Sequence, residues 1–242
     1  MTRPVRSFVP PALLVTVLAV LGAATAHGAV TVQKKPAVVE HRTFDPNNKP
    51  AEMPPLKAGE LAVTSSQFDC AAEVQLAPRR SKTRGGKHSL SYTVHGVKMM
   101  IELKVVVWNP TNASERLKAH EEGHREISET IYKTAEAHAK AAAQKLDGRR
   151  VVGEGDTPAA ATKAADEAMQ AANKQVCEEY MELTSRKGVR VQVIYDDLTG
   201  HGTKPIGEKE AIQQAFAKEA EEQRRAKGEA ATAPATRPAR RR

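Results

Sequence analysis

Apolar and polar residues alternate through much of the first half of the chain. Leu61–Leu76 and Ser89–Trp108 are rich in β-branched residues, and from Ile101 to Val107 every second residue is apolar. This period of two is typical of strands with one buried face, and the polar stretch Arg79–Lys87 predicts the connection between them. We therefore predict a small antiparallel sheet whose last strand is Val97–Trp108.

Helical spacing replaces this alternation after the sheet. Asn112 and Glu115, three residues apart, form a capping box at the start of a predicted helix. We expect this helix to run to Leu146, with Gly148 as its C-terminal stop. It contains the sequence HEEGH, from His120 to His124.

A second helix is predicted to begin at Thr157, with Pro158 in its first turn, and to end at Gly188. Its apolar residues follow spacings of three, four and seven, which indicates packing against a neighbouring helix: Ala165, Met169, Ala172, Val176 and Leu183. Residues 189–197, VRVQVIYDD, alternate again. They predict a strand, which ends in the glycine-flanked loop around His201.

The end of the chain loses this core-forming pattern. Glu208 to about Lys227 is helical in composition but mostly charged, and the residues after it predict a mobile basic tail. We therefore expect one domain at 27–207, followed by a charged helix and tail at 208–242. Aromatic residues make up only 4% of the chain, which favours long helices over a β-sandwich. The predicted fold class is α+β, with the small antiparallel sheet packed on two long helices.

The first 26 residues have the features of a cleaved signal peptide. Arg3 and Arg6 precede an apolar run from Val9 to Leu21, and residues 24–26 are small, as signal peptidase requires. The run is shorter than the ~20 apolar residues of a membrane-spanning helix. We therefore expect an exported protein, in the periplasm or outside the cell, without a transmembrane segment after cleavage.

Cys70 and Cys177 are the two cysteines of the chain. In an oxidising compartment, a pair without a third partner most simply forms one disulfide. Free thiols or metal ligands are the alternative, but neither cysteine belongs to a C-x-x-C sequence.

Basic residues gather in two places and contribute to the net charge of +8. One cluster lies within Arg79–Lys87, and the other ends the chain at Arg237–Arg242. Because these segments are predicted to be a loop and a tail, we do not expect nucleic acid as a partner. An anionic envelope surface of lipid or polysaccharide suits an exported protein better, and solvated surface charge is the alternative.

His120 and His124 are four residues apart and therefore share one face of the predicted helix. The apolar residues on the same face are Leu117, Ile127 and Ile131. Two imidazoles thus occupy positions where core residues are expected, and a metal ion is one way to satisfy them. Glu121, beside this face, supplies the carboxylate that zinc-dependent hydrolysis also needs. The alternative is a pair of hydrogen-bonded or exposed histidines.

A third ligand must come from another element. His138 lies about 21 Å further along a straight helix and cannot share an ion with His120 and His124. The compact H-E-x-x-H-x-x-G-x-x-H pattern also fails, because Ile127 and Thr130 occupy its glycine and histidine positions. The candidates that remain are Glu178, Glu179 and Glu182 on the second helix, and His201 in the glycine-flanked loop.

The HEEGH helix, a cysteine on the next helix and the later sequence QVIYDDLTGHG resemble a family of predicted secreted bacterial zinc-dependent proteases, catalogued as domain of unknown function 922. The resemblance extends from about Val30 to Gly207. The family pairs an H-E-x-x-H helix with a Y-D-x-x-T-x-H-G segment, which this chain matches at Tyr195, Asp196, Thr199, His201 and Gly202. It departs from the family at Pro205-Ile206-Gly207, where a glutamine-glycine pair is usual.

The resemblance implies a zincin-like metallopeptidase that hydrolyses peptide bonds, with Glu121 as general base. The implied Zn²⁺ ligands are His120, His124 and His201. Asp196 is a candidate for orienting a ligand histidine and Tyr195 for donating to the oxyanion, with turn capping and packing as the alternatives. A peptide substrate would pair with the Val97–Trp108 strand if that strand is a sheet edge. The alternative functions are a non-catalytic exported zinc-binding or envelope-interaction protein, and a helical interaction module.

Overall fold

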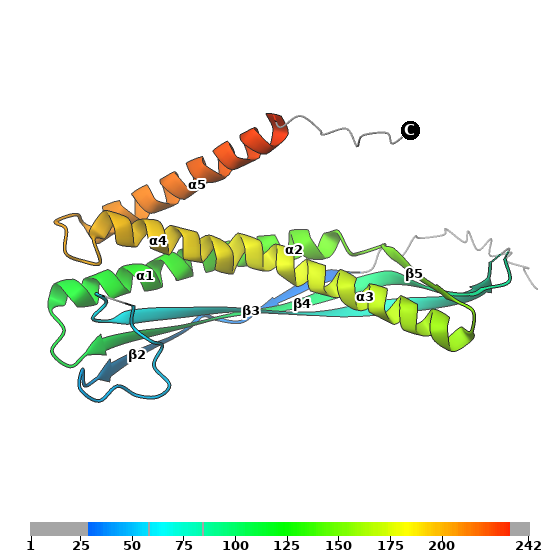
Figure 1. Ribbon diagram of the computed structural model, residues 1–242, viewed down its shortest axis with the longest axis horizontal. Coiled ribbons are helices and arrows are strands. Elements are labelled where there is room, and N and C mark those ends of the chain that lie inside the picture. Colours follow the sequence, from blue (N-terminus) through cyan, green and yellow to red (C-terminus); the bar gives the residue numbers. More distant parts are fainter. Residues whose placement is uncertain (1–28, 58, 84, 233–242) are drawn as a thin grey trace, which may run out of the picture.

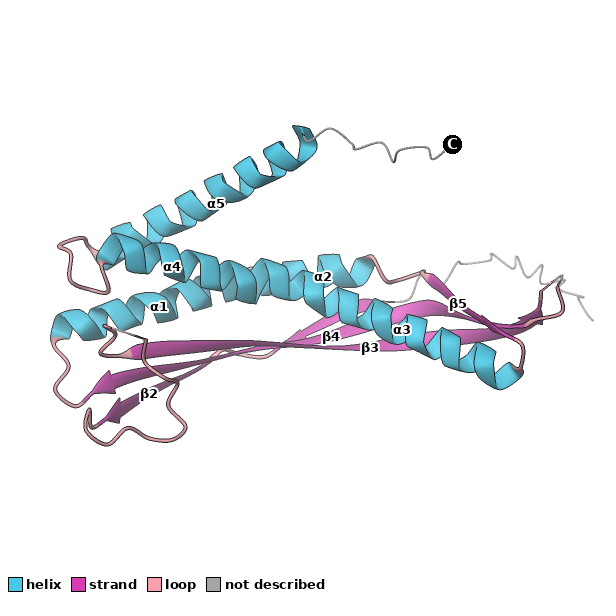
Figure 2. Cartoon of the chain, viewed as in Figure 1, coloured by secondary structure: helices cyan, strands magenta, loops and turns pink. Residues whose placement is uncertain are grey.

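The computed structural model describes residues 29–57, 59–83 and 85–232. It contains a sheet of five strands with helices on one of its faces (Figures 1 and 2). The strands are β1 (Val30–Lys34), β2 (Val38–Phe44), β3 (Val63–Lys82), β4 (His88–Pro110) and β5 (Arg150–Gly155). The helices are α1 (Glu115–Lys133), α2 (Ala135–Gln144), α3 (Pro158–Met181), a π-helix (Glu182–Arg186), α4 (Lys187–Thr199) and α5 (Glu208–Thr232). The predicted signal peptide, Arg84 and residues 233–242 of the tail lie outside the described residues.

β4 is the central strand of the sheet. On one side it pairs antiparallel with β3 over nearly its whole length. On the other side it pairs with β1 and β2 in parallel and with β5 antiparallel. The sheet is therefore mixed, and the prediction of an antiparallel sheet was wrong on this point. Because β4 has 23 residues, one of its sides accommodates three short strands end to end.

The predicted period of two separates the faces of β4. Its buried residues between positions 97 and 107 are Val97, Met99, Ile101, Leu103, Val105 and Val107. The alternate positions carry ion pairs on the opposite face: Lys98 with Glu73 at 3.5 Å, Glu102 with Lys35 at 2.7 Å and Lys104 with Glu40 at 3.0 Å. The helices α1, α2 and α3 pack on β4 and cover the apolar face.

The helix that carries HEEGH is shorter than predicted. Its N-cap is Ser114, whose hydroxyl accepts a hydrogen bond from the backbone N–H of Leu117 at 3.2 Å, so the predicted cap at Asn112 was wrong. The helix ends at Thr134, whose backbone N–H bonds to Ile131 in a tighter turn. α2 then continues separately. The predicted single helix is therefore two helices.

The second predicted helix begins as expected, because Thr157 caps α3 by accepting from the Ala160 backbone N–H at 3.2 Å. It does not end at Gly188. Instead α3, the π-helix and α4 form one long rod from Pro158 to Thr199 (Figure 1). The predicted strand at 189–197 was therefore wrong.

The burial pattern of α4 explains this error. Val191, Ile194 and Tyr195 are buried at spacings of three and four, which is the helical period. Val189 and Val193 are 60% and 53% exposed. Val189, Val191 and Val193 alternate like the residues of a strand, but only Val191 is buried, so their alternation does not mark a buried face.

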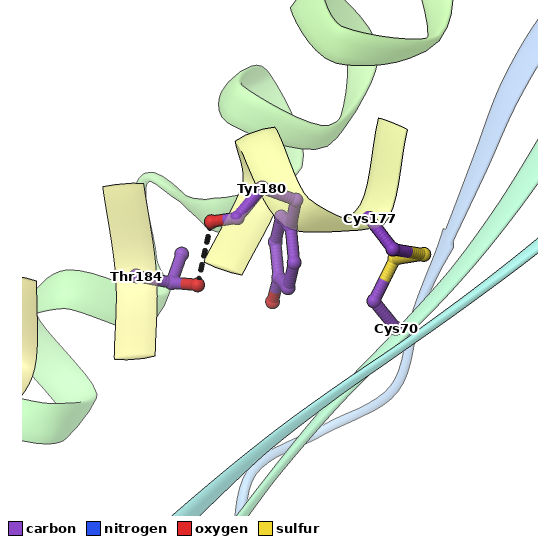
Figure 3. Close-up of a disulfide and its surroundings, with 4 residues drawn as sticks. All are labelled: Cys70, Cys177, Tyr180 and Thr184. Atoms are coloured by element: carbon purple, nitrogen blue, oxygen red, sulfur yellow. Dashed lines mark hydrogen bonds between the residues drawn. A yellow bond between two sulfur atoms is a disulfide. The ribbon is translucent and has the colours of Figure 1, made fainter. Parts of the chain in front are cut away.

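The predicted disulfide between Cys70 and Cys177 is confirmed (Figure 3). It joins the middle of β3 to the last turns of α3, which are 107 residues apart in sequence. Just beyond it, the Thr184 hydroxyl donates to the Tyr180 carbonyl at 2.8 Å within the π-helical turn. The disulfide fixes the rod of α3 and α4 to the sheet, close to the π-helical turn where the pitch of the rod changes.

The charged helix predicted after Glu208 is present as α5, which packs on α4 through Ala211, Ile212 and Ala215. Glu219 is 3% exposed and pairs with Arg190 of α4 at 3.0 Å. None of the described helices is both long and apolar enough to cross a membrane.

Gly123 allows α4 to approach α1 closely. A Cβ atom at Gly123 would lie 2.1 Å from the Tyr195 hydroxyl oxygen. We predict that Gly123→Ala lowers the free energy of unfolding by about 1–3 kcal/mol, because the buried tyrosine must shift. Chemical denaturation followed by circular dichroism measures this change. Gly207→Ala is the matched control, because a Cβ there meets no atom within 4 Å, and an equal loss in both variants would contradict the prediction.

Candidate metal centre

Three chain segments meet at the HEEGH sequence. α1 contributes His120, Glu121 and His124, all of which are buried. The last turn of α4 contributes Asp196, and the turn that ends α4 contributes His201. Asp196 and His201 were predicted to lie on a strand and in a loop. In the structure they approach α1 from the end of helix α4 and from the turn that follows it.

Imidazole nitrogens from all three histidines surround one oxygen of Asp196. Its Oδ1 lies 2.9 Å from His124 Nε2, 3.3 Å from His120 Nε2 and 3.6 Å from His201 Nδ1. The two Nε2 atoms of His120 and His124 are 3.2 Å apart. The structure thus brings together the three histidines of the predicted ligand set.

These separations suit a metal ion. Ligand atoms about 2.0–2.1 Å from a tetrahedral zinc ion are roughly 3.3 Å apart, close to the distances among His120 Nε2, His124 Nε2 and Asp196 Oδ1. His120, Asp196 and His201 form a group whose ligand atoms all lie within 4.8 Å of one another and could hold a metal ion. His124 adjoins this group through its contacts with His120 and Asp196.

Asp196 has a more central place than the orienting role predicted for it. Its Oδ1 is buried, and none of its close contacts has hydrogen-bond geometry. Burial acts to raise the pKa of Asp196, but the imidazoles of His120 and His124 outweigh it and hold the pKa well below its usual range. A buried, ionised oxygen without a hydrogen bond is a suitable ligand for a cation.

Thr199 fixes the orientation of His120. Its hydroxyl donates to the Tyr195 carbonyl at 2.7 Å, and its oxygen lies 3.4 Å from His120 Nδ1. Because the hydroxyl proton is used, the Thr199 oxygen accepts from Nδ1–H, which leaves the lone pair of His120 on Nε2. That atom faces Asp196 and His124, as a metal ligand would.

Tyr195 does not have the position that the oxyanion role requires. Its side chain is fully buried, and its hydroxyl donates to the His120 carbonyl at 3.3 Å. The ring stacks on the His120 imidazole with 5.1 Å between centroids. Burial raises the pKa of Tyr195 far above its ordinary value. We therefore replace the predicted oxyanion role by packing support for His120.

Glu121 is held from the sheet. Thr64 of β3 donates its hydroxyl to Glu121 Oε2 at 2.7 Å, and no other side chain among the described residues makes a hydrogen bond to that carboxylate. Burial raises the pKa of Glu121, against the opposing effects of His124 and Thr64. Thr64 could not be predicted from the sequence, because its contact with α1 depends on how the sheet packs.

The turn after α4 is left-handed over three residues. Gly200, His201 and Gly202 have φ angles of 55°, 52° and 77°. A non-glycine residue in this region costs of order 1 kcal/mol or more, and His201 is the only such residue in the described part of the chain. The turn brings the His201 ring to 6.4 Å from the His120 ring, while its side chain stays 54% exposed.

A cavity of about 410 Å³ opens onto this cluster. Its floor contains His120, Glu121, His124, Asp196 and His201, and its walls come from α1, α4 and the segment that leads into β3. A metal ion held by the cluster would therefore be accessible to a ligand from solution, with the Glu121 carboxylate beside it.

The other predicted ligands lie elsewhere. Glu178 and Glu182 pair with Arg186, and Glu179 pairs with Lys145 at 2.7 Å. His138 lies on α2, with its Nε2 atom 3.3 Å from the Thr134 hydroxyl. None of these side chains lines the cavity.

No protein-family model matches the chain, and no characterised protein or solved structure is significantly similar to it.

Proposed function

We propose that the chain is an exported zinc-dependent peptide hydrolase. The observation that carries this proposal is the position of the buried Glu121 carboxylate, at the floor of an open cavity beside the converging imidazoles. The resemblance to the family catalogued as domain of unknown function 922 points in the same direction. The disulfide supports export, because such bonds persist in oxidising compartments.

His120, His124 and His201 are the proposed zinc ligands, and their nitrogens all lie within 3.6 Å of Asp196 Oδ1. A bound zinc ion supplies a polarised substrate carbonyl and a water of lowered pKa. Thr199 contacts His120 Nδ1, and the Tyr195 ring stacks on the His120 imidazole. These contacts keep Nε2 directed at the centre.

Glu121 is the proposed general base. Thr64 occupies its Oε2, so the other carboxylate oxygen is the one available to take a proton from water and return it to the leaving amine. Thr64 is therefore a positioning residue for this base.

β3 is the strand suited to hold an extended peptide. The Val97–Trp108 strand does not meet the condition set for this role, because it is not a sheet edge and both sides of β4 are paired. β3 pairs only with β4 among the described strands, and its residues Val63 and Thr64 line the cavity. A peptide that adds to the outer edge of β3 would pass the cavity.

Contact with an anionic envelope surface, predicted through the basic tail, remains part of the proposal. Residues 233–242 of that tail lie outside the described residues, and the structure offers a second basic surface. Arg79, Arg80 and Lys82 are exposed at the end of β3, in the long β3–β4 arm. The turn between β3 and β4 lies at the opposite end of the sheet from the start of α1 and the end of α4, whose residues line the cavity (Figure 1). Surface attachment through this arm would leave the cavity open.

The proposed base can be tested directly. We predict that Glu121→Gln lowers kcat for peptide hydrolysis at least 100-fold, because the proton acceptor is lost while the metal ligands are kept. The measurement is a broad peptide-cleavage screen with zinc-loaded protein, together with zinc content by mass spectrometry.

Glu122→Gln is the matched control for Glu121→Gln. The neighbouring glutamate pairs with Arg125 and with His41 of β2 and does not line the cavity, so its loss should leave hydrolysis unchanged. Absence of cleavage by the zinc-loaded wild type, or full activity of Glu121→Gln, would contradict the proposed function.

The role of Thr64 predicts a difference between two substitutions. Thr64→Val removes the hydroxyl and should lower kcat about 10-fold to 100-fold with little change in KM, whereas Thr64→Ser should retain most activity. Ser66→Ala serves as control, because Ser66 bonds to Ser128 at 2.7 Å and not to Glu121. Equal activity of the valine and serine variants would exclude a positioning role.

A second candidate function is a closed, non-catalytic zinc site. Asp196 Oδ1 already lies among the three histidines, so it could complete a four-ligand shell of the structural type. The two functions differ in whether the metal keeps an open position.

The open position can be detected by spectroscopy. We predict that acetohydroxamate changes the visible spectrum of the cobalt-loaded wild type, because hydrolysis requires an open position. A spectrum that responds only after Asp196→Ala would instead identify Asp196 as the fourth ligand and favour the closed site.

A further inference from the structure

A second cavity of about 500 Å³ adjoins the first. The two share five lining residues: Glu60, Leu61, Leu117, His201 and Thr203. The proposed metal ligand His201 therefore belongs to both cavities, and a molecule bound at the metal centre can extend past it into the second cavity.

Most of the exposed surface that lines the second cavity is apolar, although polar and charged residues also border it. Phe44 comes from the end of β2, Leu56 and Leu61 from the segment before β3, and Ala113 and Leu117 from the start of α1. Leu61 is 68% exposed, the highest value for any large apolar side chain in the described part of the chain. An apolar group that covered Leu61 would remove its side chain from water, and this burial of apolar surface would stabilise binding.

Two of the three charged residues at this cavity, Arg116 and Glu60, are occupied by other contacts, whereas the side chain of Lys49 makes no hydrogen bond or ion pair within the described part of the chain. Arg116 donates to the backbone carbonyl of Lys204. Glu60 accepts from the Lys57 backbone N–H at 2.8 Å and pairs with its ammonium group at 3.3 Å. These contacts hold the walls in place and leave the apolar side chains to interact with a ligand.

We infer that this cavity binds a bulky apolar side chain of the peptide substrate, on one side of the bond to be cleaved. The inference rests on the proposed function, because it takes the peptide carbonyl to lie beside Glu121 and the imidazoles. Concave apolar cavities next to a few directed polar groups are the usual form of such binding sites. The substrate class is thus peptides with a leucine-like or phenylalanine-like residue at that position.

Binding can be measured without turnover in the zinc-loaded Glu121→Gln chain. The probes are fluorescein-labelled alanine-rich peptides, each carrying one leucine or one glycine at the same central position. Fluorescence anisotropy should give a dissociation constant at least tenfold lower for the leucine peptide than for the glycine peptide, as expected for one apolar pocket. Equal constants would overturn the inference.

Ala113→Phe provides the matched substitution. Ala113 lines the second cavity and not the first, so a larger side chain there fills the proposed pocket without entering the metal centre. In the Glu121→Gln background it should weaken binding of the leucine peptide about tenfold and leave the glycine peptide unchanged. Val189→Phe, an exposed position on α4 that lines neither cavity, should change neither.

Leu61→Ser keeps the test valid if Ala113→Phe does not fold, because Leu61 is mostly exposed and its loss does not affect the core. It too should reduce the preference for the leucine peptide. An equal effect of either substitution on both peptides would overturn the pocket assignment.

The two proposals can fail separately. Selective binding of the leucine peptide by a chain whose wild type cleaves no peptide would refute hydrolysis and retain the pocket. Cleavage by the wild type without any preference between leucine and glycine peptides would refute the pocket and retain hydrolysis.

Discussion

The close packing of α4 on α1 is the contact on which the site depends. Gly123 leaves room for Tyr195, whose ring lies on His120. Once Tyr195 is fixed, the next residue of the helix, Asp196, faces the histidines, and Thr199 one turn later reaches His120 Nδ1. The helix therefore sets the spacing of three polar contacts at once, and the left-handed turn after it returns His201 to the same point.

The sheet holds this pair of helices from the other side. The inward-facing residues of β3 follow one another along α1, with Thr64 at Glu121 and Ser66 at Ser128. Gln192 of α4 donates to the same Ser128 hydroxyl at 3.0 Å. With the disulfide fixing the rod of α3 and α4 to β3, the cavity lies between three elements that are joined to one another. A rigid surround of this kind is what a preorganised site requires.

The sequence predicted most reliably those features that depend on local spacing. The alternation in β4, the cap at Thr157 and the helix with His120 and His124 were predicted from such patterns, whereas the disulfide was predicted from the number of cysteines in an exported chain. The sequence could not show that residues 189–197 are helical, because Val189 and Val193 imitate a strand while remaining exposed. Thr64 and the central place of Asp196 depend on how distant segments pack, and no local pattern encodes that.

The polar cluster is costly for the fold as it stands. His124 Nδ1 is buried without a hydrogen bond, which costs about 1–3 kcal/mol. A cation at the centre would be held by ligands from both α1 and α4, so metal binding and the packing of α4 on α1 should stabilise each other. Because His201 is the exposed member of the cluster and sits in a strained turn, it is the ligand that the metal would have to order. The metal would then also fix the wall that separates the two cavities, which links the proposed chemistry to the proposed recognition of the substrate.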